Sequence, residues 1–404
     1  MDSFHLLQAI RHEFDWHVRQ HQGTEVYRAP SLTNPVLPMF ALDRWATGPG
    51  QDTSDIYTVM RPALQLASMW LTEDLPLLWF SHLTFGHRRR NAAGQVYLEM
   101  NPHYRTPAAL HTVKDNLHEF GKTNFFAFAH PDCKEKFAGV TYVKKESMSH
   151  YREFSRTDFP PVLSDKGVYK PCICLAQRFR GAFRSTNASA NERYRALFIF
   201  AVVLCHEVAH GYYMFLESGN EPLWAENEKN PELGFSWELS VLGHIPVPNG
   251  KTASNDRFQE IHAIRLLEAP SSAVRDKVLQ SLAGSSRAEF TTRDASGHYR
   301  NWPVVNHGKF RGATWTMSSD AQLFIASFHV VPMHWVVSWF QKDIWEALKA
   351  RWVQKKMYEP PALGQTFMAI YERTSNGVQV HRPLYPGNRV DAMILEEHRK
   401  SVQK

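Results

Sequence analysis

The sequence predicts a mixed α+β protein, and three observations lead to that prediction. Short apolar runs separated by turn residues occupy residues 94–184, a texture typical of strands. Residues 190–217 then predict a long helix, because the apolar run 194–205 within them has no helix breaker. The chain has 404 residues and no internal repeat, which suits one large domain or two ordinary ones. We therefore expect helices, a small mixed sheet, a central helix and a mostly helical C-terminal lobe, in that order.

The N-terminal quarter is predicted to be helical with one long interruption. Residues 3–21 have the apolar spacing of an amphipathic helix, and Ser3 can cap it. Residues 22–55 are rich in Pro, Gly, Asn and Asp, so they are expected to be mostly loop. Residues 56–85 again show helical periodicity.

Four short runs are predicted to be the strands of the small sheet. They are Gln95–Leu98, Phe125–Ala129, Gly139–Val143 and Cys172–Leu175. Cys172 and Cys174 alternate along the last run, so both side chains should face the same side of the sheet. We expect them to pack as small apolar residues rather than to bind a metal.

The C-terminal part of the chain is expected to form a lobe of its own. Residues 246–256 and 284–301 are rich in polar and turn-forming residues, and they predict surface loops or a lobe boundary. The Trp-rich run 333–356 predicts a strong helix that packs in the core. The predicted division is 1–245, with the sheet and the site helices, and 246–404, a mostly helical lobe that closes the cleft.

Composition excludes several classes of function. The formal net charge is +6, but Lys and Arg are scattered and no nucleic-acid motif is present. Four cysteines are too few for a disulfide-built scaffold. The N-terminus has no apolar signal sequence, and no uncharged apolar run approaches the roughly 20 residues that span a bilayer. We therefore expect a cytoplasmic protein without a membrane or nucleic-acid partner.

The most specific feature is an H-E-x-x-H motif formed by His206, Glu207 and His210. A capping box at 189–192 predicts a helix that starts there and continues through the apolar run 194–205 to the motif. The two histidines then lie one turn apart on one face, where both can reach a single tetrahedral Zn²⁺. Glu207 points away from the face that carries the two histidines, and it is placed to act on a water molecule.

A catalytic zinc site needs a third protein ligand, and no third histidine follows at a metzincin spacing. The nearby acidic candidates are Glu217, Glu221, Glu226, Glu228, Glu232 and Glu238. Most of them lie in the polar stretch 218–232 and are expected to be solvated. Glu238 lies in an otherwise apolar stretch that can form a second helix, so its carboxylate needs a partner. Glu238 is the predicted third ligand, followed by Glu228 and then Glu226.

The motif followed by a helical glutamate resembles the zincin metallopeptidases of the Glu-liganded gluzincin branch. The resemblance covers roughly residues 190–243. It implies a zincin-like fold, with a small mixed sheet and a substrate-binding edge strand before the motif helix. It implies that His206, His210 and Glu238 bind zinc and that Glu207 is the general base. The chain departs from the family pattern because it has neither G-x-M-E-N nor N-E-x-x-S-D, and Leu242 stands where a second acidic residue is usual.

Gluzincins also supply a Tyr or His donor to the oxyanion from tens of residues beyond the third ligand. Tyr299 and His307 are the catalytic candidates in that range, with His298 beside them. The sequence therefore predicts a zinc-dependent hydrolase whose substrate is most simply a peptide. Two alternatives stay open: a zincin-fold enzyme acting on a small molecule, and a non-catalytic protein whose histidine helix is structural. The oligomeric state is not predicted.

Overall fold

The structure is a computed structural model that comprises two compact units. The larger unit comprises Val26–Gln259 and His334–Ala362, and the smaller comprises Met1–Glu25, Glu260–Met333 and Leu363–Lys404. The residues described are 19, 21–23, 28–46, 52–129, 137–142, 172–217, 220–226, 231–249, 258, 260–268, 287–291, 324–363, 368–374 and 377–383.

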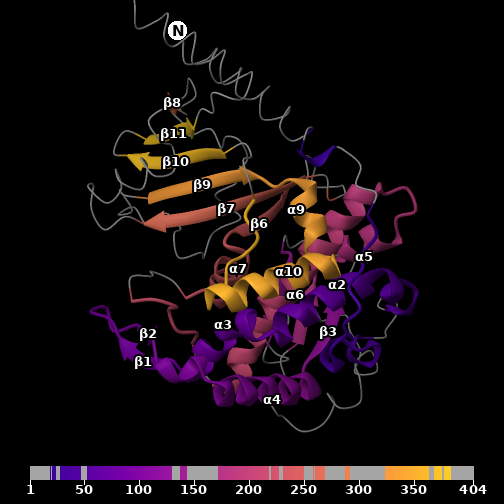
Figure 1. Cartoon of the computed structure of the whole chain (residues 1–404), viewed down its shortest axis with the longest axis horizontal. Helices are drawn as coiled ribbons and strands as arrows, with labels where there is room; N and C mark the ends of the chain where they lie inside the picture. Colours follow the sequence, from indigo (N-terminus) through magenta and orange to yellow (C-terminus); the bar gives the residue numbers. More distant parts are fainter. Residues whose placement is uncertain are drawn as a thin grey trace, which may run out of the picture. The chain divides into compact units, whose positions relative to one another are not determined.

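The larger unit is mainly helical, with the mixed α+β composition that the sequence predicts (Figure 1). Its α-helices are α2 (Ser54–Thr72), α3 (Asp74–Phe85), α4 (Pro107–Thr123), α5 (Gln177–Arg184), α6 (Ala190–Leu216), α7 (Leu233–Leu242) and α10 (Lys342–Lys355), and α9 (Met333–Ser338) starts at its boundary. Short 3₁₀ turns are η1 (Pro38–Phe40), η2 (Leu42–Arg44) and η3 (Pro102–Arg105). Its strands are β1 (His87–Arg90), β2 (Val96–Glu99), β3 (Phe125–Phe128), β4 (Gly139–Tyr142), β5 (Cys172–Leu175) and β6 (Ile245–Asn249).

A three-stranded mixed sheet precedes the central helix in the chain. The order is β3-β5-β4, with β3 parallel and β4 antiparallel to β5, so β4 is an edge strand among those described. Cys172 and Cys174 are fully buried in an apolar cluster on this sheet, which confirms that they pack. Separately, β1 and β2 form an antiparallel hairpin.

Helix α6 is the central element of the larger unit, and it packs against α2, α5, α7, β4 and β5. The predicted capping box is present, because the Ser189 hydroxyl accepts from the Glu192 amide while the Glu192 carboxylate accepts from the Ser189 amide. By length and composition α6 could also cross a membrane, but 83% of its most apolar window is buried inside the structure. That burial is what the core helix of a folded unit shows.

Aromatic side chains fill the space around the start of α6. Trp70 on α2 makes edge-to-face contacts with Phe198 on α6, Trp237 on α7 and Trp339 between α9 and α10. Trp335, Trp339, Trp345 and Trp352 are each at most 2% exposed. The prediction that the Trp-rich run 333–356 is core is therefore confirmed, although the run forms two helices interrupted after Ser338.

The smaller unit contains antiparallel strands in the order β7-β9-β10-β11-β8. Their bounds are Glu260–Glu268 for β7, Phe324–Val330 for β9, Met368–Thr374 for β10, Gly377–Pro383 for β11 and Arg287–Thr291 for β8. The described part of 246–404 is thus richer in strand than in helix, unlike the mostly helical lobe that was predicted. The Asn376-Gly377 dipeptide between two runs with β-branched and aromatic residues is a hairpin signal that the prediction overlooked. The two units also alternate along the chain rather than dividing at residue 245.

Most predicted elements of the larger unit are present, and two helices were missed. The predicted strands correspond to β2, β3, β4 and β5, and residues 56–85 form α2 and α3. Helices α4 and α5 lie within the region predicted to be strands. The signals for α4 are the cap Thr106, whose hydroxyl accepts from the Ala109 amide, and proline at the first helical position. Most of residues 3–21 lies outside the described residues.

The capping box makes a direct prediction for stability. Ser189→Ala removes the oxygen that accepts from the Glu192 amide, so the free energy of unfolding should fall by about 1 kcal/mol. Urea denaturation followed by circular dichroism measures this change. Asn187→Ala is the matched control, because Asn187 is exposed in the preceding turn. Equal effects of the two substitutions would contradict a role for the cap.

Candidate metal centre

The two histidines of the motif lie on one face of α6, as their spacing predicts. The ring centroids of His206 and His210 are 5.1 Å apart. Their side chains are 14% and 16% exposed, so both are accessible although the helix around them is buried. This part of α6 therefore offers two imidazoles to one point in space.

Glu232 lies between the two imidazoles. Its Oε1 is 3.2 Å from His206 Nε2 and 3.1 Å from His210 Nε2. Its Oε2 accepts a hydrogen bond from the Phe235 amide, which makes Glu232 the N-cap of α7. One donor atom from each of the three residues lies within 4.8 Å of the others, and this is the one such group of three or more found within the described ranges. Two imidazoles and one carboxylate are a ligand set that catalytic zinc uses.

The other nitrogen of each imidazole also contacts a carboxylate. His206 Nδ1 is 2.7 Å from Glu238 Oε1, and His210 Nδ1 is 2.5 Å from Glu221 Oε1. A carboxylate at Nδ1 fixes the ring orientation and, once the ring is neutral, favours the tautomer whose Nε2 lone pair can bind a metal. Both histidines are thus oriented with Nε2 toward Glu232.

In this geometry Glu232, rather than the predicted Glu238, lies beside both Nε2 atoms, so Glu232 becomes the candidate third ligand. Glu238 is on α7 beside α6, as predicted, but its carboxylate meets Nδ1 rather than Nε2 of His206. The Glu238 side chain is 5% exposed, whereas that of Glu232 is 17% exposed.

A glycine allows α7 to approach the motif. A Cβ atom on Gly234 would lie 2.3 Å from His206 Nε2, a distance that real Cβ atoms do not show. A side chain at this position would therefore displace the imidazole. Because Gly234 is two residues after Glu232, the same close approach brings the Glu232 carboxylate between the histidines.

Glu207 points toward the edge strand β4. Its Oε2 accepts a hydrogen bond from Thr141 Oγ1 at 2.7 Å, and the Thr141 hydroxyl is also 3.0 Å from the Glu207 carbonyl. A Cβ on Gly139 would lie 2.7 Å from Glu207 Oε1, so glycine is needed where the carboxylate packs on the strand. Glu207 is thus held beside the three-residue cluster without contacting either Nε2 atom.

Charge pairing stabilises the protonated imidazoles in the structure. Burial alone would lower the pKa of His210, but Glu221 and Glu232 outweigh it and raise the pKa to about 10. In His206 burial likewise opposes the charge, and Glu232 and Glu238 raise the pKa well above its usual value. Burial would raise the pKa of Glu232, but the two imidazoles hold it well below the usual range.

The pKa values of the two other buried carboxylates, Glu207 and Glu238, are raised, whereas that of Glu232 is lowered. Burial raises the pKa of Glu238 to about 7, although His206 partly opposes this. Burial also raises the pKa of Glu207, against the lowering effects of His206, His210 and Thr141. A glutamate whose pKa is raised toward neutrality is suited to take and return a proton.

The cluster fits a divalent cation by charge as well as by geometry. With both imidazoles protonated and Glu232 ionised, the three side chains carry +2 and −1. A divalent cation that replaces the two protons leaves the net charge of the cluster unchanged. Glu232 Oε1 lies 3.2 Å from His206 Nε2 and 3.1 Å from His210 Nε2. Only small movements of the three side chains would therefore let all three donor atoms lie 2.0–2.2 Å from one zinc ion. The residues present therefore suit a metal ion of this charge.

Among the remaining candidates that the structure describes, Glu217 and Glu226 do not join the cluster. Glu217 forms an ion pair with Arg88 at 2.5 Å, and the side chain of Glu226 is exposed. Glu228, His298, Tyr299 and His307 lie outside the described residues. A signal for Glu232 was present in the sequence, because it immediately precedes the apolar run that forms α7 and has a glycine two residues later. It was grouped instead with the solvated turn.

The chain matches no protein-family model, no curated protein and no solved structure.

The geometry predicts different roles for two neighbouring glutamates. Glu232→Ala should abolish stoichiometric zinc, because it removes a direct ligand. Glu238→Ala should keep the ion at saturation but weaken its affinity about 10- to 100-fold, the usual effect of losing a group that orients a histidine ligand. Elemental analysis and competition with a chelator measure both effects.

Glu226→Ala is the matched control for the two substitutions, since it removes an exposed carboxylate from the same part of the chain. It should leave zinc content and affinity unchanged. Loss of zinc in Glu238→Ala with full retention in Glu232→Ala would reverse the assignment. Stoichiometric zinc in His206→Ala/His210→Ala would place the metal elsewhere.

Metal binding should release protons. The raised pKa values mean that both imidazoles are protonated at pH 7, and each must lose its Nε2 proton before a metal can bind there. Zinc affinity should therefore rise between pH 6 and pH 8. Titration calorimetry in buffers of different ionisation enthalpy counts the protons released, which should approach two. Binding without proton release would contradict this protonation state.

Proposed function

We propose that this protein is a zinc-dependent hydrolase with a zincin-like site and that its substrates are peptides. The observation that carries the proposal is the convergence of His206 Nε2, His210 Nε2 and Glu232 Oε1 on one point, with Glu207 alongside. Zinc, when bound, supplies a Lewis acid that polarises a carbonyl and lowers the pKa of water toward neutrality.

Glu207 is the proposed general base. Its carboxylate is held by Thr141, and burial raises its pKa above the usual value for a glutamate, which makes it a stronger base. It would accept a proton from the attacking water and then donate it to the leaving nitrogen. Glu207 is 4% exposed, so few solvent molecules can compete with the substrate for its proton.

The edge strand β4 supports a peptide substrate. Thr141 and Gly139 on β4 contact the Glu207 side chain, so the strand runs next to the proposed base. Among the described strands β4 pairs only with β5, and an edge strand can bind an extended peptide through main-chain hydrogen bonds. Such pairing would place a scissile amide near Glu207.

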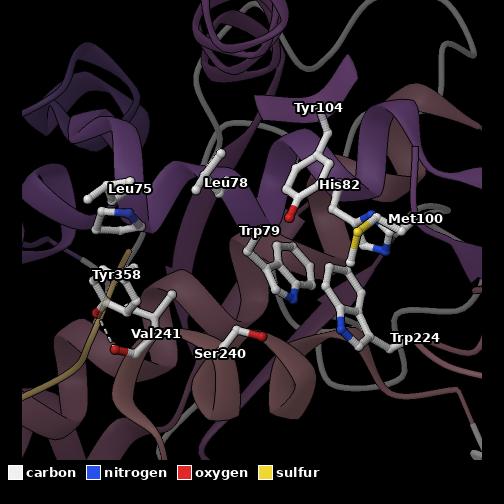
Figure 2. Close-up of a pocket in the computed structure, with 11 residues that line it drawn as sticks. Leu75, Leu78, Trp79, His82, Met100, Tyr104, Trp224, Ser240, Val241 and Tyr358 are labelled. Carbon is white, nitrogen blue, oxygen red and sulfur yellow. Dashed lines mark hydrogen bonds between the residues drawn. The ribbon is translucent and has the colours of Figure 1, made fainter. Parts of the chain in front are cut away.

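A small-molecule enzyme is the weaker alternative. It would require an enclosed pocket that includes the cluster. The apolar pocket drawn in Figure 2 has none of His206, Glu207, His210 or Glu232 in its lining. A purely structural histidine–glutamate cluster is the remaining alternative, and it predicts a folded protein without bound metal or turnover.

The proposal is tested by hydrolysis of a pooled library of quenched fluorescent peptides, with cleavage sites read by mass spectrometry. Glu207→Gln keeps the size of the side chain but cannot act as a base at neutral pH. It should retain zinc, while the rate falls about 10²- to 10⁴-fold. Glu226→Gln, the exposed control, should keep the full rate.

Three outcomes would contradict the proposal. Full activity in Glu207→Gln would remove Glu207 from the mechanism. Zinc-loaded protein that cleaves no peptide in the pool would exclude a general peptidase. Iron in place of zinc in the purified protein would favour oxidative chemistry, because two histidines and one carboxylate also bind non-haem Fe(II).

A further inference from the structure

A second site lies on the larger unit, between α3, α7 and the segment that follows α10. It is a pocket of about 270 Å³. Figure 2 shows side chains from these elements around an open region, with Leu75 and Leu78 on one side and Ser240 and Val241 on the other. Drug-sized pockets start near 300 Å³, so this one suits a ligand of one or two rings.

The pocket has an aromatic wall. Trp79 on α3 and Trp224 stack with ring centroids 4.8 Å apart and an interplanar angle of 8°. The ring of His82 meets Trp224 edge to face. Burial, with a smaller effect of Arg88, lowers the pKa of His82 to about 4, so this ring is neutral at pH 7. Flat, uncharged surfaces of this kind favour aromatic ligands.

The polar atoms of the lining are mostly occupied. Trp79 Nε1 donates to Ser236 Oγ at 3.2 Å, and the Tyr358 hydroxyl donates to the Val241 carbonyl. The Tyr104 hydroxyl accepts from Arg105 Nε at 2.7 Å. Ser240 Oγ, by contrast, has no hydrogen-bond partner among the described residues. His82 Nδ1 is buried and likewise has no hydrogen-bond partner within the described ranges, so a ligand would find the Ser240 hydroxyl and this ring nitrogen available within an otherwise mostly apolar lining.

Two further features indicate the polarity of the ligand. The lining contains no Asp, Glu, Lys or Arg. Burying a charged group there would cost desolvation energy without a compensating ion pair. Met100 lines the pocket yet is 62% exposed, which makes it one of few large apolar side chains with such exposure in the described part of the chain. A bound apolar ring would cover this flexible side chain.

The pocket is distinct from the metal centre although both use α7. Gly234 and Glu238, one turn apart, face His206. Ser236 and Ser240, also one turn apart, face Trp79 and the pocket. Residues two positions apart in a helix are separated by about 200° around its axis. The two sites therefore lie on nearly opposite faces of α7.

We propose that this pocket binds an uncharged aromatic ligand of one or two rings that carries a single hydrogen-bonding group. The rings would lie against the wall formed by Trp79 and Trp224, and the polar group would meet Ser240 Oγ. The proposal does not depend on the metal centre, so it is tested on metal-free protein.

The test is calorimetric titration with indole, and with three matched probes. Indole should bind at least about 10-fold more tightly than tryptamine or indole-3-acetate, because each of these carries a charge. Indene has the same two-ring shape without the N–H group, and it should bind about 2- to 10-fold more weakly than indole, the range expected for one hydrogen bond.

Two variants locate the binding site. Leu78→Trp fills the pocket and should weaken indole binding at least about 10-fold, while Leu42→Trp, at an exposed position on η2, should not change it. Ser240→Ala should remove the difference between indole and indene and leave indene affinity unchanged. This second variant changes an exposed side chain, so it keeps the test valid even when Leu78→Trp does not fold.

No binding of indole to the folded protein would overturn the proposal. Equal affinity for indole and its two charged derivatives would contradict the inferred polarity. Unchanged affinity in both Leu78→Trp and Ser240→Ala would place the ligand elsewhere. To distinguish a free ligand from an aromatic side chain, the same titration uses a blocked peptide with one central tryptophan. Binding of indole without binding of the peptide supports a free ligand, and binding of the peptide more tightly than indole supports a peptide side chain.

Discussion

The interaction on which the site depends is the pairing of two imidazoles with carboxylates near the C-terminal end of an apolar helix. Helix α6 is buried along most of its length, and an unpaired charge there would cost several kcal/mol. His206 and His210 each have a carboxylate at Nδ1 and share Glu232 at Nε2. The segments that carry these carboxylates are therefore held against α6 by the charges they neutralise.

Helix α7 is positioned by this pairing. Glu232 caps its first turn with one oxygen and meets both histidines with the other, so helix start and site geometry are fixed together. Gly234 brings the first turn against His206, and Glu238 holds the same ring from the second turn. A short helix with three contacts to the motif cannot slide along α6 without breaking one of them.

The opposite face of α7 is used differently. Ser236 and Ser240 face a wall of aromatic rings, where contacts are apolar and few hydrogen bonds are made. One helix thus separates a polar, ion-paired centre from an uncharged pocket. A ligand on one face that favours a particular placement of α7 would change the affinity for a ligand on the other face. By thermodynamic linkage, the second ligand would then change the affinity for the first by the same factor.

The sequence by itself determined the central helix, its capping box and the i, i+4 placement of the two histidines, because these depend on interactions within one helix. It also identified strands β3, β4 and β5, whose apolar runs are bounded by turn residues. The choice of Glu232 over Glu238 was decided by tertiary structure. Both residues are near α6, and the placement of α7 against it puts Glu232 Oε1 beside both Nε2 atoms and Glu238 Oε1 beside His206 Nδ1. The strand content of the C-terminal region was also missed. The β10–β11 hairpin had a local signal in Asn376-Gly377, whereas the β7–β9 and β8–β11 pairs join segments far apart in the chain and are only weakly encoded in local sequence.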